Sequence, residues 1–276
     1  MDDSKIYVVT HKPFELSDNL REKGYELITV GNNANAMKND GISDRSGDTI
    51  YQKNPNYCEL TAAYWIWKNV KTDIKGFCHY RRYFTNSTLK FEERKIPSVQ
   101  NMKDVLEKEQ KPSIILPERK YYNKSSKELY LECGYEKDLE TTRQVIKEKY
   151  PDYLDEYDEM LDSNSGYLTN MMIAEAKVYD SYNEWLFDIL EEVENRTDIS
   201  NYTKAEARIY GYISERLVDV WVKHNKIKCI EYQSVNTEDS CNVRYLVYRV
   251  SKKINLYKKI KDLMYLWNRM RNSRRN

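Results

Sequence analysis

Four short apolar runs, rich in β-branched residues, are spread through the first half of the chain. They are Lys5–Thr10, Tyr25–Val30, Ile74–Tyr80 and Ser113–Leu116, and each ends in polar or turn-forming residues. Runs of this length with such ends are typical of buried strands. The third run leads directly into two arginines, and charged residues at the end of a buried strand indicate a binding site.

Between the second and third runs, apolar residues recur at the spacing of one helix face. Asn56 followed by Glu59 predicts a capping box that begins this helix. That role alone accounts for Glu59. The apolar face consists of Leu60, Ala63, Tyr64 and Trp67.

Further helices are expected over residues 102–109 and 180–194. A second capping box, Thr203 with Glu206, precedes another apolar face, formed by Ile209, Ile213, Leu217 and Trp221. Strands that alternate with helices predict an α/β sheet.

Composition adds one unusual feature to this pattern. The 276 residues include 25 Tyr, and the net charge is only +1. The mean hydropathy of −0.85 is low, but the aromatic side chains supply enough apolar area for a core. A net charge this close to zero gives no sign of nucleic-acid binding. The polar start, the absence of a long apolar segment and five cysteines without a CxxC pair predict a cytoplasmic protein with reduced thiols.

Charge is unevenly distributed along the chain. Residues 242–276 carry 11 basic residues and one acidic residue, a net of +10, whereas residues 1–241 carry −9. We therefore treat 1–241 as a catalytic domain and 242–276 as a basic tail. Within the tail, Tyr257, Ile260, Met264, Trp267 and Met270 recur at helical spacing. This pattern fits a helix lying on an anionic membrane surface, or a terminal helix packed on the body.

Several kinds of site are excluded by missing motifs. The chain has no GxGxxG, GxxxxGK[ST], GxSxG or HExxH sequence, which argues against nucleoside triphosphatases and serine hydrolases. Its three histidines, His11, His79 and His224, are far apart and give no zinc-ligand spacing.

Polar residues at predicted strand ends are the strongest candidates for a site. Thr10, His11 and Lys12 follow the first strand, and the sequence from His79 to Tyr83 includes Arg81 and Arg82. In a doubly wound sheet both groups lie at the carboxyl edge, where ligands bind. Arginines there suit phosphate, and tyrosines can stack on a base or sugar. The alternative is that the arginines form surface ion pairs.

A second candidate is a polar stripe on the helix that follows Thr203. Its members are Arg208, Tyr212, Glu215 and Asp219. Such stripes are usually solvated. Gly211 lies inside this helix at a cost of roughly 1 kcal/mol relative to Ala, which indicates that a backbone or ligand comes close. Glu215 is then a candidate general base.

The segment Asn54–Asn69 together with Gly76–Phe84 resembles the signature block of a bacterial family of capsular and exopolysaccharide synthesis proteins. This is a domain family of unknown function whose members look like glycosyltransferases. The resemblance covers about residues 5 to 240. Shorter matching stretches are Tyr7–Lys12, Ile114–Pro117, Asn170–Ile173, Glu184–Phe187 and Gly211–Leu217.

The resemblance implies a GT-A-like, Rossmann-like mixed sheet flanked by helices. It also implies transfer of a hexose from a nucleotide sugar to a growing, often lipid-linked, surface glycan. A UDP-sugar of galactose, including the furanose form, is the first expectation for the donor. A tail on the inner face of the membrane would bring a cytoplasmic enzyme to such an acceptor.

One feature departs from the broader GT-A pattern. Those enzymes usually hold a divalent metal with Asp-x-Asp, a sequence absent from this chain. Our hypothesis is that Arg81 and Arg82 neutralise the leaving diphosphate, so that no metal cofactor is required, although manganese and magnesium are not excluded.

Motif position within the resemblance suggests the remaining roles. Glu215 is the first choice for the base that deprotonates the acceptor, and Asp138 is the second. Asn170, Glu184 and Tyr212 are expected to meet the sugar or acceptor. The residues expected to contact the nucleotide sugar are Thr10, His11, Lys12, Asn56, Tyr57, His79, Tyr80, Arg81 and Arg82.

Two other functions remain open at this point. One is a non-catalytic protein that binds a sugar nucleotide or glycan on the same fold. The other is a phosphotransferase that acts on cell-envelope sugars, which the same arginines would suit. A plain interaction scaffold is least consistent with the density of matched motifs, and a fold alone decides none of these.

Overall fold

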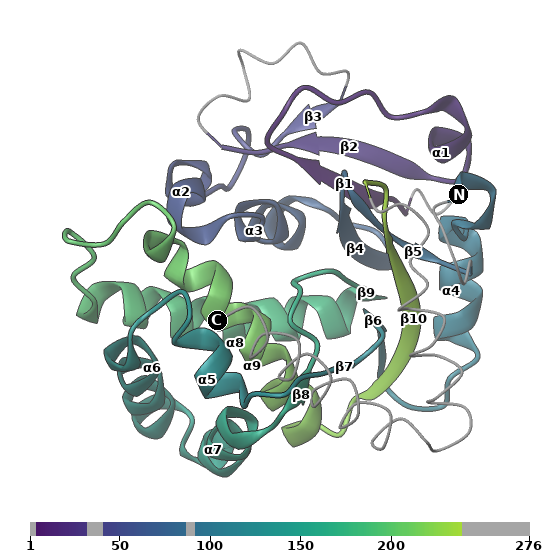
Figure 1. Ribbon diagram of the computed structural model, residues 1–276. Coiled ribbons are helices and arrows are strands. Elements are labelled where there is room, and N and C mark those ends of the chain that lie inside the picture. The colour runs from purple at the N-terminus through teal and green to yellow at the C-terminus, as the bar shows by residue number, and fades with distance from the viewer. Residues whose placement is uncertain (1–3, 32–40, 87–91, 239–276) are drawn as a thin grey trace, which may run out of the picture.

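A mixed β-sheet with helices on both of its faces forms the framework of the protein (Figure 1). The computed structural model describes residues 4–31, 41–86 and 92–238. The eight strands of the main sheet are β1 Ile6–Thr10, β2 Tyr25–Thr29, β3 Ile42–Ser43, β4 Ile74–His79, β5 Arg82–Thr85, β6 Ser113–Pro117, β9 Met172–Glu175 and β10 Lys228–Asn236. A separate small sheet pairs β7 Lys120–Tyr121 with β8 Ser165–Gly166.

Nine helices connect these strands in the described part of the chain. They are α1 Asp18–Glu22, α2 Asn54–Tyr57, α3 Leu60–Asn69, α4 Val99–Glu107, α5 Ser126–Tyr130, α6 Glu136–Lys149, α7 Leu154–Asp162, α8 Ala176–Arg196 and α9 Ile209–His224. Helices α5, α6 and α7 follow one another between β7 and β8. None of the described helices is long and apolar enough to span a membrane.

The sheet is parallel in its first half and mixed in its second. Strands β3, β2, β1 and β4 run parallel, whereas β9 lies antiparallel to both β4 and β6. β10 pairs with β6 and with β5, and β5 folds back on β4, so the pairings of β4, β5, β10, β6 and β9 form a closed circuit. The carboxyl ends of β1 and β4 meet in register, with Val9 opposite His79.

Alternate residues of β1 enter two separate cores. Tyr7 and Val9 belong to the larger core, which includes residues of α3, α6, α8 and α9, whereas Ile6 and Val8 belong to a smaller core with α1 and α4. Because successive strand residues face opposite sides of a sheet, a strand with a core on each side is apolar throughout. This explains the uninterrupted apolar runs in the sequence.

The four predicted strands are confirmed to within one residue at either end. The prediction of one helix that begins with a capping box at Asn56 and Glu59 is wrong. The chain forms two helices there, because Cys58 adopts a left-handed φ of 54° between α2 and α3. Glu59 precedes α3 without capping it, which leaves its carboxylate available for other contacts.

The second predicted capping box is present. The Thr203 amide donates to Glu206 Oε2 at 2.8 Å, and the Glu206 amide donates to Thr203 Oγ1 at 3.3 Å. It begins a short 3-10 turn that leads into α9. The basic tail, residues 242–276, lies outside the described residues, so the tail boundary and its membrane role stay predictions.

Candidate functional site at the carboxyl edge of the sheet

A cavity of about 760 Å³ opens where β1 and β4 end. We call it the strand-end cavity. Its lining comes from the ends of β1, β2 and β4, the turn before β5, helices α2 and α9, and the last residues of β10. The lining residues are Val9, His11, Val30, Asn54, Pro55, Cys58, Glu59, His79, Tyr80, Arg81, Arg82, Lys204, Arg208, Glu215 and Asn236.

The turn from β4 to β5 forms one wall of this cavity. The Tyr80 amide donates to Val9 O at 3.0 Å, which ties the turn to the end of β1. The Tyr80 ring packs edge-on against His11, with 5.7 Å between ring centroids, and Arg81 lies over the same ring. The Tyr80 hydroxyl is buried and has no hydrogen-bond partner among the described residues.

The two arginines of this turn differ in their surroundings. Arg81 is exposed and its Nη1 lies 3.1 Å from Glu238 Oε2. Arg82 is half-buried, and in the described part of the chain no hydrogen bond or ion pair is found for its side chain. Because a buried cation without a partner is costly, Arg82 is the better prepared of the two to receive an anion.

The opposite wall is formed where α2 approaches α9. A Cβ atom added at Gly211 would lie 3.2 Å from Cys58 Sγ, a contact so tight that Cys58 would have to shift by a few tenths of an ångström. The expectation of a close approach at Gly211 is thereby confirmed. Arg208 Nε donates to Cys58 Sγ at 3.1 Å, which holds its guanidinium at the cavity.

A buried hydrogen-bonded chain holds Glu59 at the base of the cavity. Ser214 Oγ donates to Asn170 Oδ1 at 2.8 Å, and Asn170 Nδ2 donates to Glu59 Oε1 at 2.8 Å. The same carboxylate oxygen lies 3.7 Å from His79 Nε2. Ser214 and Asn170 are almost fully buried, so this chain fixes the Glu59 carboxylate rather than leaving it to solvent.

Glu215 is the second carboxyl group of the cavity. Burial, followed by the negative charge of Glu59, raises the pKa of Glu215 to about 8. The positive charges of Arg216, Arg82 and Arg208 oppose this shift without cancelling it. A carboxyl group with a pKa near neutrality is suited to proton transfer.

The cavity carries an excess of positive charge. Four cationic side chains, Arg81, Arg82, Lys204 and Arg208, line it together with two carboxyl groups. Burial lowers the pKa of both His11 and His79, and the neighbouring cations lower it further, so we count neither histidine as a charge. The arrangement attracts an anion.

Six of the residues predicted as site residues line this cavity: His11, His79, Tyr80, Arg81, Arg82 and Glu215. Of the predicted polar stripe, Glu215 is half-buried at the cavity, whereas Arg208, just before α9, is exposed as expected of a solvated position. Thr10 and Lys12 are not among the lining residues. Thr10 is buried, and its hydroxyl donates to Lys12 O at 2.8 Å, which shapes the turn after β1.

Asn56 and Tyr57 support the cavity wall without lining it. Asn56 Nδ2 donates to Ala207 O at 2.7 Å and so ties α2 to the start of α9. Tyr57 is buried, and its hydroxyl donates to Glu194 Oε2 at 2.9 Å. These contacts give both residues a structural role, and their predicted contact with the nucleotide stays a prediction.

The structure does not bring Asp138 to the cavity. It is fully buried at the start of α6 and accepts hydrogen bonds from the hydroxyls of Tyr130 and Tyr202 and from the Tyr135 amide. A carboxylate that is held by three donors and shielded from the cavity is a structural group. We therefore withdraw the assignment of Asp138 as an alternative base.

The three residues predicted to meet sugar or acceptor lie in different places. Asn170 is behind the cavity wall, where it holds Glu59. Tyr212 is half-buried beside it, with the Arg208 guanidinium 5.4 Å from its ring centroid. Glu184 is exposed on α8 and is not part of the cavity lining, which corrects its predicted role.

Sequence reasoning missed several lining residues, of which Glu59 matters most. The apparent capping box concealed it, and no other signal in the sequence marked it. Lys204 lies between the two capping-box residues, Thr203 and Glu206, and Asn236 ends β10, a strand that carried no sequence signal. In the described ranges no group of three His, Cys, Asp or Glu side chains could hold a metal ion. Independence of a metal stays a prediction.

An α/β sheet with a cation-lined cavity at the carboxyl ends of its strands is the arrangement of proteins that bind phosphorylated ligands. Residues 5–226 match the family described as domain of unknown function DUF4422, and the chain belongs to that family.

A solved structure, the apo form of the WbbM bifunctional glycosyltransferase, is similar to this chain with a TM-score of 0.73 and 28% sequence identity. The similarity covers 85% of this chain and 45% of that one, so this chain spans less than half the length of its structural neighbour. No curated protein matches the chain.

Proposed function

We propose that this protein is a glycosyltransferase that transfers a hexose from a nucleoside diphosphate sugar to an acceptor glycan. The observation that carries the proposal is the strand-end cavity, in which an arginine-rich wall faces two carboxyl groups. Family membership and the similarity to a bifunctional glycosyltransferase support the same class of reaction.

The cationic wall is suited to the diphosphate of the donor. Arg82 has no ion-pair partner among the described residues, and Arg208 and Lys204 approach from the opposite side. Guanidinium groups bind phosphate oxygens through paired hydrogen bonds and stabilise the charge that develops as the diphosphate leaves. In this proposal the arginines neutralise the leaving diphosphate, as a divalent metal does in other enzymes of the class.

The carboxyl groups are suited to the acceptor. An acceptor hydroxyl is a weak nucleophile, and a base that takes its proton favours direct displacement at the anomeric carbon. We assign this base to Glu215, which accepts the proton while the bond between the anomeric carbon and the diphosphate oxygen breaks. Glu59, held by Asn170, is placed to orient the sugar or its hydroxyls.

The donor and acceptor follow from the family resemblance. We propose a UDP-sugar, with galactose or its furanose form as the first choice, and a surface glycan, often lipid-linked, as acceptor. The first experiment is a thermal-shift series with UDP, GDP, CMP and dTDP and their sugars, with and without manganese. A ligand that binds only the folded state raises its melting temperature.

We expect one nucleotide class to raise the melting temperature without manganese, and Arg82→Ala to remove that shift. Transfer of radiolabelled sugar to a glycan primer then tests the reaction itself. Activity that EDTA abolishes and manganese restores would contradict the arginine hypothesis. Labelled phosphate in the acceptor would instead indicate a phosphotransferase.

A further inference from the structure

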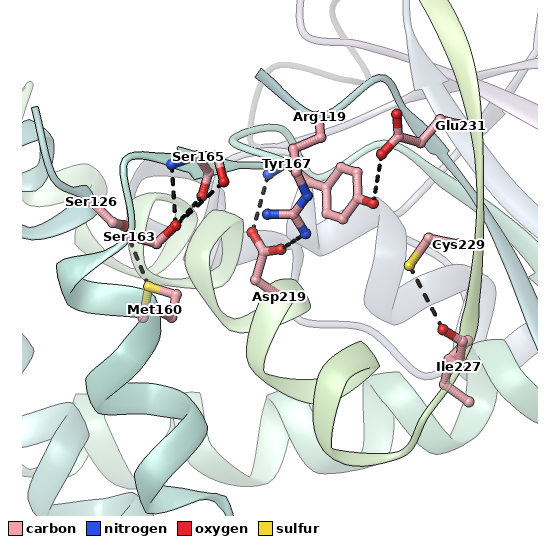
Figure 2. Close-up of polar contacts among 10 residues, drawn as sticks. All are labelled: Arg119, Ser126, Met160, Ser163, Ser165, Tyr167, Asp219, Ile227, Cys229 and Glu231. Atoms are coloured by element: carbon pink, nitrogen blue, oxygen red, sulfur yellow. Dashed lines mark hydrogen bonds and ion pairs between the residues drawn. The ribbon is translucent and has the colours of Figure 1, made fainter. Parts of the chain in front are cut away.

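A second cavity, of about 390 Å³, lies between the end of α9, helix α7 and the small β7–β8 sheet (Figure 2). We call it the Arg119–Asp219 pocket. Its size is within the range of small-ligand sites. It is lined by Arg119, Glu156, Glu159, Met160, Ser163, Ser165, Asp219, Val222, Lys223, Ile227 and Cys229.

An ion pair with a fixed geometry forms one side of this pocket. Arg119 Nη2 bonds Asp219 Oδ1, and the side chains are only 26% and 11% exposed. The Arg119 guanidinium lies 4.2 Å from the centroid of the Tyr167 ring, and the Tyr167 amide donates to Asp219 Oδ2 at 3.1 Å. Figure 2 shows the Tyr167 hydroxyl reaching Glu231 on the far side. These contacts hold the Arg119 guanidinium, a hydrogen-bond donor, and the Asp219 carboxylate, an acceptor, in one orientation.

One further ion pair lines the pocket, and its third carboxylate has only a histidine as a neighbour. Lys223 forms an ion pair with Glu159, and Glu156 Oε2 lies 3.5 Å from His224 Nδ1. Two cationic side chains and three carboxylates line the pocket. It therefore offers no excess positive charge to an anion.

The pocket nevertheless has polar groups that a neutral ligand could use. Glu156 Oε2 is buried and receives no hydrogen bond from the described residues. The Ser163 hydroxyl donates to Ser165 O at 3.0 Å, which holds both serines at the pocket edge (Figure 2). A buried acceptor without a donor calls for a ligand or water that supplies one.

From this geometry we propose that the Arg119–Asp219 pocket binds an uncharged carbohydrate, namely the part of the acceptor glycan that lies beyond the reacting sugar. The assignment rests on the proposed function. Sugar hydroxyls both donate and accept hydrogen bonds, and the pocket presents fixed donors and fixed acceptors side by side. The paired charges disfavour a phosphate, which needs unpaired cations.

The position of the pocket along α9 agrees with this assignment. Asp219 lies one helical turn after Glu215, a separation of about 6 Å along the axis. Tyr122 is half-buried and interacts electrostatically with Glu215, Arg82 and Asp219, so it lies within range of both cavities. An extended glycan held at Asp219 could thus present its terminal sugar at Glu215.

The direct test is the binding of neutral tetrasaccharides of galactose, glucose and mannose, measured by saturation-transfer NMR. Ser165→Trp fills the pocket, and Asp219→Asn removes a charged acceptor with little change in shape. Ser181→Trp, on the exposed side of α8, is the matched control. Circular dichroism checks that each variant is folded.

We expect at least one tetrasaccharide to bind the unmodified protein, and Ser165→Trp and Asp219→Asn to weaken it tenfold or more. Arg82→Ala and Ser181→Trp should leave this binding unchanged. UDP binding should respond in the opposite way, lost in Arg82→Ala and kept in Ser165→Trp. The proposal is overturned if no tetrasaccharide binds, or if Arg82→Ala abolishes tetrasaccharide binding while Ser165→Trp does not.

A transfer assay separates this inference from the proposed function. The KM for the acceptor should fall as the primer lengthens from one to four sugars. Ser165→Trp should remove this dependence on primer length. The kcat for the shortest primer should stay unchanged in this variant. Transfer with an unaltered length dependence would refute the pocket assignment alone. Tetrasaccharide binding without transfer from any sugar nucleotide would refute the proposed function and the acceptor role, and leave a carbohydrate site.

Discussion

The strand-end cavity and the Arg119–Asp219 pocket lie along one polar stripe of α9 but differ in how their charges are balanced. The first has four cationic side chains against two carboxyl groups, and Arg82 has no ion-pair partner among the described residues. The second has two cationic side chains, each paired with a carboxylate. The two cavities therefore differ in how many of their charges are unpaired, and for that reason we propose an anion for the first and a neutral ligand for the second.

Removing the proposed base should have the largest effect on the strand-end cavity. Glu215→Gln keeps the shape of the side chain but cannot accept a proton, so we expect kcat to fall by about 10³-fold. UDP affinity should change less than threefold, because the cationic wall is intact. Initial rates and calorimetric titration of UDP measure the two quantities. An unchanged kcat in a folded variant would show that Glu215 is not the base.

Removing Arg82, which has no ion-pair partner among the described residues, should lower activity slightly less than removing the carboxylate of Glu215. For Arg82→Ala we expect kcat/KM to fall about 100-fold, or ~2.7 kcal/mol, because the developing charge on the diphosphate loses one donor. Arg82→Lys should recover part of the loss, since it keeps the charge but not the paired hydrogen bonds. Arg81→Ala is the matched control, and its effect should be smaller because Arg81 is exposed and paired with Glu238. Equal losses of kcat/KM in Arg81→Ala and Arg82→Ala would contradict the difference that we assign to the two arginines.

Breaking the ion pair of the second pocket should lower stability rather than donor binding. Arg119→Met leaves Asp219 partly buried without its cation, and we expect the free energy of unfolding to fall by about 2–3 kcal/mol. Urea denaturation measures this loss. The affinity for UDP should remain that of the unmodified protein. Weakened UDP binding in this variant would mean that the two cavities are not electrostatically separate.

The pH dependence should report the raised pKa of Glu215. Because a base acts in its ionised form, kcat/KM should rise about tenfold per pH unit below the pKa of about 8 and level off above it. Glu59→Gln removes a negative charge that raises this pKa, so the midpoint should move to lower pH. If the midpoint pH of kcat/KM is the same in Glu59→Gln, the charge of Glu59 does not raise the pKa of Glu215.

The same shift predicts a pH-dependent change in stability. Between the pKa of an unfolded Glu, about 4.3, and about 8, the folded state holds a proton that the unfolded chain has lost, so stability falls as pH rises through this window. Glu215→Gln cannot ionise and should therefore gain in melting temperature relative to the unmodified protein as pH increases from 5 to 8. Calorimetry at these two pH values measures the difference. A constant difference would show that the pKa of Glu215 is not raised.

Local patterns in the sequence predicted the parts of the site that depend on one segment. The strand ends at His11 and His79, the arginines after β4 and the close approach at Gly211 each follow from neighbouring residues. The assignment of Asp138 failed because its carboxylate caps the start of α6 at the Tyr135 amide and, in the fold, also accepts from the hydroxyls of Tyr130 and Tyr202. Glu59 was misread because a capping box and a helix break have the same local sequence.

The sequence by itself determined strands β1, β2, β4 and β6, helices α3, α4, α8 and α9 and the cation-rich turn, because hydrophobic period and turn chemistry act over a few residues. Tertiary structure decided which charges meet. Asn170 reaches Glu59 across 111 positions of the chain, and Arg119 reaches Asp219 across 100. Pairing of charges depends on distances of a few ångströms between segments that the chain separates, and it is this pairing that distinguishes the two cavities.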